Sequence, residues 1–149
     1  MKNKLLLMLT LLGAPGFVFA ATDLAASEYN FAVNELSKSS YNQAAIIGQV
    51  GVNNNANVQQ HGQKLLAAVS QEGGNNRANI DQSGSYNLAY IDQKGNSNNA
   101  SINQGAYGNT AVIIQKGSGN KANITQYGTQ KTAVVVQRQS QMAIRVIQR

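Results

Sequence analysis

From Gln43 onward, apolar and polar residues alternate, and the alternation restarts every eleven residues. The repeated phrase, with substitutions, is Asn-x-Ala-x-Ile-x-Gln-x-Gly-x-x, and it occurs ten times. Because like residues within a phrase stand two apart, their side chains share one face of a β-strand. The glycine after each strand permits backbone angles that other residues avoid. Each phrase therefore predicts a strand of about seven residues followed by a tight turn.

The slots of the phrase predict which side chains stack. The alanine slot holds alanine nine times and then Ile144, and the next slot holds only isoleucine or valine. The amide slots hold Gln49, Gln60, Gln71, Gln82, Gln93, Gln104, Gln115, Gln126, Gln137 and Gln148, with Asn54, Asn76, Asn87, Asn98, Asn109 and Asn120. We expect the aliphatic slots to form a dry core and the amides to bond their equivalents above and below. A one-residue slip would expose every branched residue, so this pattern fixes the register.

Two phrases make one unit, because the outward residues are mostly apolar in the first strand and polar in the second. The resulting repeats are 41–62, 63–84, 85–106, 107–128 and 129–149. Stacking strand–turn–strand units on one another gives two parallel sheets face to face. The predicted fold is all-β, a β-solenoid or cross-β stack of five 22-residue repeats.

The outward strands of repeats four and five are the most apolar. The segment "TAVVVQ" has high β-propensity, no charge and no proline, which is typical of a steric-zipper segment. We expect repeats four and five to nucleate more strongly than repeats two and three. Asp81 and Asp92 interrupt the middle of the stack as charged breakers. The predicted nucleation-prone residues are Val112, Ile114, Val134, Val135 and Val136.

Repeat five departs from the phrase. Gln139 replaces the turn glycine, Met142 replaces asparagine and Ile144 replaces alanine. One interpretation is a degenerate terminal repeat, since terminal repeats are often atypical. The other is a contact to surface-anchoring machinery, made by a unit too loosely fitted to be an ordinary rung, whose cations meet an acidic partner. The predicted contact residues are Lys131, Arg138, Arg145 and Arg149.

The first twenty residues read as a secretory signal peptide. A short basic segment precedes the apolar run Leu5–Leu12, and small residues at 18–20 suit cleavage after Ala20 or, as the alternative, Ala21. The run is too short to span a bilayer comfortably. Removing Lys2 and Lys4 would lower the net charge from +6 to +4. We expect an exported protein with residues 21–40 as a separate N-terminal segment.

Composition argues against catalysis. Cysteine is absent, so no disulfide holds the exported chain, and His61 is the single histidine, interpreted as a turn residue. Asp81 and Asp92 occupy equivalent slots on opposite strands and form no carboxylate pair. We expect no enzyme activity, no metal, no cofactor, no small-molecule substrate and no nucleic-acid partner.

Two function classes remain. One is a soluble β-solenoid that binds ice or carbohydrate through a flat face, and the other is a building block whose open edge templates more of the same stack. A flat-face binder would want a regular outward array of threonine or aromatic residues, and none is present. The phrase continues to Gln148, which leaves an unpaired edge where a capped soluble solenoid would end. The open edge favours templating.

Five tandem 22-residue units punctuated by glutamine, asparagine and glycine, behind a secretory signal, resemble the curlin family. The resemblance covers 41–149, and it is specific because all five units keep one register. The family's major fibre subunit usually has serine in the first amide slot and a glycine-rich N-terminal segment. Here that slot holds Gln43, Leu65, Asn87, Asn109 and Lys131, which favours the family's minor, nucleating branch.

The resemblance implies extracellular curli fibres that serve adhesion and biofilm. The partners that it implies are the major curlin subunit, further copies of the same chain, an outer-membrane secretion pore and the pore's extracellular accessory protein. It also implies that 21–40 carries the export signal. The amide-slot residues would be the fibre-templating site.

Overall fold

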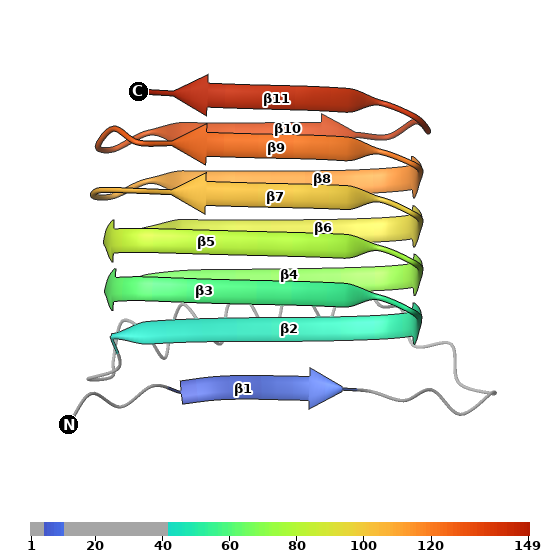
Figure 1. The fold of residues 1–149 in the computed structure, drawn as a ribbon, viewed down its shortest axis with the longest axis horizontal. Coiled ribbons are helices and arrows are strands. Elements are labelled where there is room, and N and C mark those ends of the chain that lie inside the picture. The colour runs from blue at the N-terminus through green and yellow to red at the C-terminus, as the bar shows by residue number, and fades with distance from the viewer. Residues whose placement is uncertain (1–4, 11–41) are drawn as a thin grey trace.

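The computed structural model describes the backbone of residues 5–10 and all of residues 42–149 as a stack of strands in two layers (Figure 1). In chain order after the first strand, every second strand joins the same layer, and successive strands run in opposite directions across the stack. Sheet A contains β1 (Leu5–Thr10), β2 (Gln43–Val52), β4 (Leu65–Gly74), β6 (Leu88–Asn96), β8 (Thr110–Ser118) and β10 (Thr132–Gln137). Sheet B contains β3 (Asn55–Gln63), β5 (Arg77–Ser85), β7 (Asn99–Gln104), β9 (Lys121–Gln126) and β11 (Ala143–Gln148).

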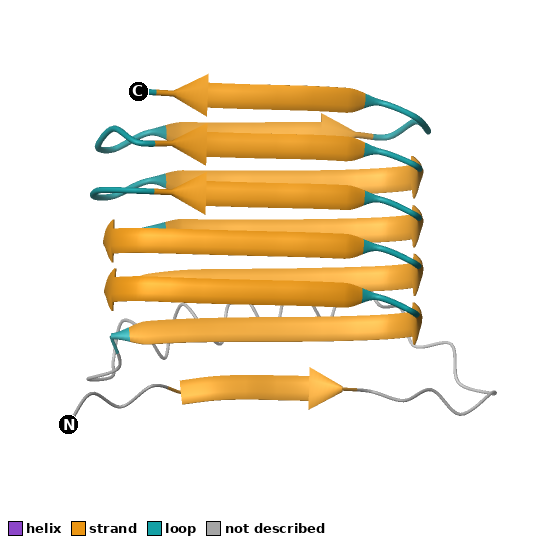
Figure 2. Ribbon diagram, viewed as in Figure 1, coloured by secondary structure: helices purple, strands orange, loops and turns teal. Residues whose placement is uncertain are grey.

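Neighbouring strands within each sheet are parallel and, from β2 onward, offset by one 22-residue repeat. Gln49 pairs with Gln71 in sheet A, and Gln60 pairs with Gln82 in sheet B. The same offset continues to the last strand, where Gln126 pairs with Gln148. The predicted fold is therefore confirmed: a parallel β-solenoid of about five turns, in which strands and short loops make up the described part of the chain (Figure 2).

The core lies between the two sheets and is built from the two aliphatic slots. The inward alanines and branched residues of the middle repeats have no exposed surface, as at Ala89, Ile91, Ala100 and Ile102. They form one continuous cluster that extends from Ile47 to Val135. Small and branched residues alternate along each strand, so that two close sheets can pack without voids.

The turns contain an unusual backbone angle that the glycine pattern did not predict. Glycines such as Gly51 and Gly73 have positive φ, as expected, but a second residue of each turn is also left-handed. In most turns this second residue is not glycine, as at Asn53, Lys64, Asn75, Tyr86, Ser97, Gln130 and Gln141. Gly108 and Gly119 take the same position in two other turns, and Ala106 is left-handed in the place of a turn glycine. Left-handed backbone is costly for a residue with a side chain. The stacked turn therefore imposes this conformation on residues whose type does not signal it.

Repeat two is more buried than its pattern indicates, and one expectation about repeat five is wrong. Leu66 and Ala68 belong to the outward set of β4, yet they are only 3% and 5% exposed, so β4 is buried on both faces. Repeat five was expected to fit too loosely to be an ordinary rung. Instead, β10 and β11 pair in register with β8 and β9 along their whole length. The departures at Met142 and Ile144 do not interrupt the backbone ladder.

The predicted signal peptide and the segment 21–40 lie outside the described residues, except for β1. This strand pairs in parallel with β2, from Leu5 against Ala44 to Thr10 against Gln49. In the full chain, β1 therefore occupies the outer side of β2. In the described residues no helix is long and apolar enough to cross a membrane.

Candidate functional site: the amide columns and the open edges

The glutamines form two continuous hydrogen-bonded columns, one in each sheet. In each step, the Nε2 of one glutamine donates to the Oε1 of the glutamine 22 residues later. In sheet A, the steps from Gln49 through Gln71, Gln93 and Gln115 to Gln137 measure 2.6, 2.7, 2.9 and 2.8 Å. In sheet B, the steps from Gln60 through Gln82, Gln104 and Gln126 to Gln148 measure 2.9, 2.9, 2.9 and 2.7 Å.

The same amide nitrogens also tie the two sheets together. Gln71 Nε2 in sheet A donates to the carbonyl of Asn55 at 3.1 Å, and Gln82 Nε2 in sheet B donates to the carbonyl of Leu66 at 3.1 Å. Each interior glutamine thus donates twice and accepts once at a buried position. Among the described residues, no buried side-chain nitrogen or oxygen lacks a hydrogen-bond partner. A buried amide without partners would cost about 1–3 kcal/mol, so the columns strongly fix the register.

The asparagines act differently from the expected side-chain ladders. Asn54 Oδ1 accepts a hydrogen bond from the backbone N–H of Asn76 at 3.1 Å, rather than from its amide. Asn54 Nδ2 donates to the carbonyls of Val50 at 3.1 Å and Gly73 at 3.0 Å. The oxygen-to-backbone contact recurs at Asn76, Asn87, Asn98, Asn109 and Asn120. Each asparagine therefore joins its own turn to the turn of the next repeat.

The turn glycines form a third column. A Cβ added to Gly73 would lie 2.1 Å from the carbonyl oxygen of Gly95, and a Cβ on Gly51 would lie 1.9 Å from that of Gly73. These separations are far below any van der Waals contact, and the turns stack closely because a side chain is absent. Both glycines also have φ near 115°. The turn thus requires glycine for two separate reasons.

The predicted nucleation-prone residues divide between the two faces of sheet A. Val135 is 3% exposed and belongs to the core, whereas Val134 and Val136 are 60% and 44% exposed on the outer face. Val134 lies beside Val112, and Val136 lies beside Ile114. Four of the five predicted residues thus form one apolar patch over β8 and β10.

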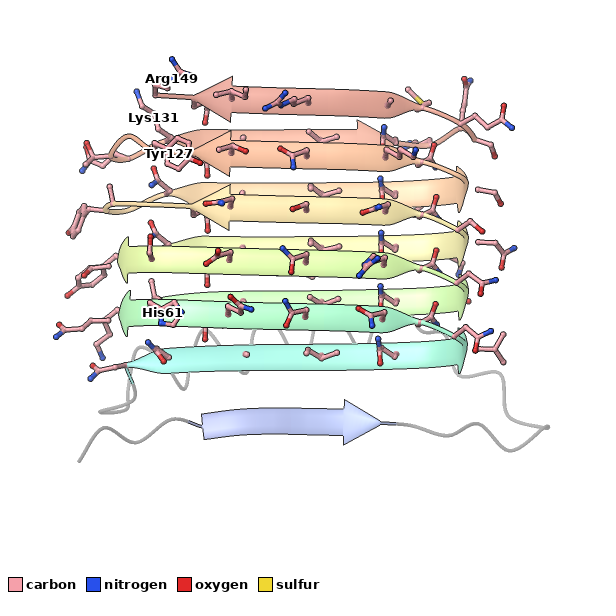
Figure 3. The ribbon with its side chains drawn as sticks, in the orientation of Figure 1. His61, Tyr127, Lys131 and Arg149 are labelled. Atoms are coloured by element: carbon pink, nitrogen blue, oxygen red, sulfur yellow. The ribbon has the colours of Figure 1, made fainter. Side chains whose placement is uncertain are left out.

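The four predicted anchor cations do not form one cluster. Lys131 and Arg149 lie at the same end of the stack (Figure 3), where the Lys131 side chain and the Arg149 backbone approach the turn at Gly128. Arg138 directly follows β10, which runs toward the opposite end, and Arg145 lies in the middle of β11. An acidic partner could engage Lys131 and Arg149 together but not all four cations at one point.

Charged groups on the outer face of sheet A occupy the middle repeats. The Lys94 ammonium and the Glu72 carboxylate form an ion pair at 2.9 Å. Burial raises the pKa of Asp92 above its ordinary value of 3.8, while Lys116 and a hydrogen bond from Ser70 oppose the shift. Asp81 lies on sheet B and Asp92 on sheet A, so the two carboxylates point away from each other. Asp92 is thus a partly buried carboxylate between Ser70 of β4 and Ile114 of β8 on this face.

Residues with possible chemistry do not converge. His61 lies within β3, beside Ser83, rather than in the expected turn (Figure 3). No group of three or more His, Cys, Asp or Glu side chains within the described residues could hold a metal ion. Sequence reasoning missed the ring contact between Tyr86 and Tyr107, whose centroids lie 5.3 Å apart. It also missed the outer amide contact from Asn57 to Asn79. Asn57 and Asn79 stand one 22-residue repeat apart, and this spacing is the signal by which the sequence could have indicated their contact.

Comparison with known families agrees with this arrangement. The family model described as "Curlin associated repeat" matches three overlapping segments, 51–84, 73–105 and 95–128, which together cover just over half of the chain. The chain belongs to the curlin repeat family. The predicted resemblance is thereby confirmed, and the matched segments contain much of the amide, alanine and glycine columns described above.

The similar curated proteins are minor curlin subunits. This curlin is 76% identical over 69 residues to the minor curlin subunit of Salmonella typhimurium (strain LT2), covering 45% of this chain and 46% of that protein. It is 78% identical over 68 residues to that of Escherichia coli (strain K12), covering 44% and 45%. The match thus spans about half the length of these relatives. No solved structure matches.

Proposed function

We propose that this curlin is a minor subunit of extracellular curli fibres that nucleates polymerisation of a major curlin subunit. The observation that carries the proposal is the register: the same two glutamine columns join every repeat to the next, and in the described residues β3, β10 and β11 each have one unpaired edge. An unpaired strand offers backbone N–H and C=O groups to another chain. A partner with matching glutamine and asparagine spacing would add as the next rung.

The alternative, a soluble β-solenoid that binds ice or carbohydrate, finds no support in the outer faces. Such a module repeats one residue type along an outward column. In sheet A one outward column consists of Gly48, Ser70, Asp92, Ile114 and Val136, which share neither size nor polarity. In sheet B the column of Asn57, Asn79, Ser101, Asn123 and Arg145 ends in a cation. Neither of these two columns repeats one residue type as a regular ligand lattice would require.

The proposed route to the cell surface begins with export of the chain and removal of its first twenty residues. Passage through the outer membrane would use the curli secretion pore, with the pore's accessory protein outside. Retention at the surface is assigned to Lys131 and Arg149, because these two residues of repeat five lie at the same end of the stack. Fibres built on such retained nuclei would serve adhesion and biofilm.

The decisive experiment is deletion of the gene in a bacterium that secretes the major subunit. Without the nucleator, the major subunit should remain soluble around the cells, and expression of the wild-type chain in trans should restore fibres. In a purified system, seeds of this chain should shorten the lag of dye-binding by the major subunit. Fibres that form equally well in the deletion strain would contradict nucleation.

Surface retention has its own test. Lys131→Gln with Arg149→Gln should release the nucleator into the medium, whereas Arg138→Gln with Arg145→Gln removes the same charge from separate places and should not. Immunodetection of cell-bound and free protein measures the difference. Equal retention of the two double variants would contradict an anchor at this position.

A further inference from the structure

Within each amide column, the hydrogen bonds between successive repeats keep one fixed direction along the stack. Each glutamine donates toward the later repeat, and each asparagine oxygen accepts from the later repeat. The orientation is forced, because Gln71 Nε2 also donates to a backbone carbonyl that can only accept, and Asn54 Oδ1 faces a backbone N–H that can only donate. The two ends of the stack are therefore chemically different.

The first end, named here the repeat-one edge, consists of the open side of β3 and the turn from Gly51 to Asn54. In later repeats, the Oε1 of the glutamine at the position of Gln60 accepts from an earlier glutamine. The backbone N–H at the position of Asn54 donates to an earlier asparagine, and the carbonyl at the position of Gly51 accepts from that asparagine's amide. If another chain placed a rung with this glutamine and this asparagine before repeat one, its side chains would find all three partners at the repeat-one edge: Gln60 Oε1, the Asn54 N–H and the Gly51 carbonyl.

The other end, named here the repeat-five edge, consists of the open sides of β10 and β11. It keeps the terminal glutamines Gln137 and Gln148, but Lys131 and Met142 replace the two asparagines. The backbone N–H groups of Lys131 and Met142 still donate to the side-chain oxygens of Asn109 and Asn120, at 2.9 and 3.0 Å. Neither side chain has an amide with which to continue the column. A following rung would lose both asparagine contacts.

We propose that this chain templates from its repeat-one edge, and that the partner it takes there is a chain of the same eleven-residue phrase whose last rung keeps asparagine in both slots. A second copy of this chain would bring Lys131 and Met142 to the same junction and leave the N–H of Asn54 and the carbonyl of Gly51 without amide partners. The nucleator thus selects another repeat protein over itself. This inference rests on the proposed nucleation and adds its direction and its partner.

In the full chain, β1 lies beside the repeat-one edge. β1 occupies the outer side of β2, so β3 is the open half. Residues 5–10 contain neither asparagine nor glutamine and cannot extend the amide columns. Removal of residues 1–20, as expected for a signal peptide, would free β2 and complete the edge. Before export, β1 would therefore keep the edge of β2 paired, so that only β3 could accept another chain.

The test uses two seeds that differ only in which edge is damaged. Gln60 and Gln148 are matched, because they are the two outermost members of the sheet B glutamine column. Gln60 has one bond to a glutamine at 2.9 Å and one to a backbone carbonyl at 3.0 Å. Gln148 has one bond to a glutamine at 2.7 Å and one to a backbone carbonyl at 3.1 Å. The soluble probe is the full chain carrying Lys131→Asn and Met142→Asn, which completes the asparagine slots. Seeds of wild type, Gln60→Leu and Gln148→Leu are compared by the rate at which they elongate with the labelled probe.

Wild-type and Gln148→Leu seeds should elongate at similar rates, and Gln60→Leu seeds about fivefold more slowly, the factor that corresponds to one lost hydrogen bond. Loss of elongation at Gln148→Leu seeds, or equal rates for all three, would overturn the assigned direction. Wild-type seeds that fail to accelerate the probe at all would instead contradict nucleation itself. The two failures are thus distinguishable.

Two further comparisons test the selected partner and the leader. The Lys131→Asn, Met142→Asn chain should polymerise alone with a shorter lag than wild type, while Lys131→Ala with Met142→Ala, which adds no amide, should not. Equal lags for the asparagine and alanine variants would overturn selection against a second copy. Removing residues 1–20 through a protease site placed after Ala20 should raise the elongation rate of wild-type seeds. An unchanged rate would contradict the inference that β1 blocks elongation at the edge of β2.

Discussion

Repeats three and five follow the same phrase but reach different degrees of burial. The inward residues of β7 in repeat three, Ala100, Ile102 and Gln104, are fully buried. The equivalent residues of β11 in repeat five are only partly buried. β7 has a neighbour on each side, whereas β11 pairs with β9 alone. Burial in this fold is therefore a property of the neighbouring rungs as much as of the residue, as in other repeat proteins.

Repeats three and five also differ in the hydrogen bonds that their side chains can form with a following rung. Asn98 in repeat three accepts from the backbone of Asn120 and donates to the carbonyl of Gly117. Met142 in repeat five donates its backbone N–H to Asn120 of the preceding rung, but its side chain has no group with which to form the equivalent bonds to a following rung. Repeat five is thus an ordinary rung on one side and a poor template on the other. Paired substitutions in the interior and in repeat five can test this difference.

The largest contrast is expected in the turn glycines. Gly73→Ala should lower the free energy of unfolding by about 4 kcal/mol, because its Cβ would lie 2.1 Å from the Gly95 carbonyl and φ is 112°. Gly117→Ala has the same unfavourable φ, but its Cβ would lie 3.1 Å from the nearest atoms of repeat five, so the loss should be about 1–2 kcal/mol. Denaturant unfolding of the monomer measures both, and equal losses would contradict tight interior stacking.

The next contrast concerns the glutamine column. Gln93→Leu keeps the volume but removes the donor to Gln115 and the acceptor of Gln71, so it should cost about 2–4 kcal/mol. Gln148→Leu breaks one column bond at a partly exposed position and should cost about 1 kcal/mol. Unfolding free energies at matched protein concentration provide the comparison. A neutral Gln93→Leu variant would show that the column does not stabilise the monomer.

A smaller contrast is expected in the core. Val69→Ala removes two methyl groups between β2 and β6, where valine is 3% exposed, and should cost about 2–3 kcal/mol. Val146→Ala makes the same change in β11, where the side chain is partly buried, and should cost about 1 kcal/mol. The difference between the two unfolding free energies is the measured quantity. A larger loss at Val146 would mean that repeat five is buried in solution, for example by another chain.

The smallest effect concerns Asp92, whose equivalent in repeat five is Val136. Because burial raises the pKa of Asp92 in the folded state, folding favours its protonated form. Wild-type stability should therefore be highest below the ordinary pKa of 3.8, fall as pH rises through the raised pKa, and stay lower above it. Asp92→Asn should remove this part of the pH dependence and be more stable than wild type near neutral pH. Unfolding from about pH 3 to about pH 7 checks the slope, and parallel curves would contradict the burial effect.

The sequence by itself determined the architecture, because a strict period decides which residues become neighbours. Once equivalent positions stack, alternation sets the inward face, and the unbroken glutamine slot must form columns such as Gln71 above Gln49. The period also predicted the parallel register and the sharp turns. These features depend only on spacing and residue type.

Only the tertiary structure decided how the neighbours bond. Asn54 reaches the backbone of Asn76 rather than its side chain, and this one-directional geometry makes the two edges unequal. The left-handed turn residues, the burial of both faces of β4, and the separation of Arg138 from Arg149 were equally absent from the pattern. A repeat specifies which residues meet, but the direction of each hydrogen bond follows from the distances between particular donors and acceptors in the folded turns.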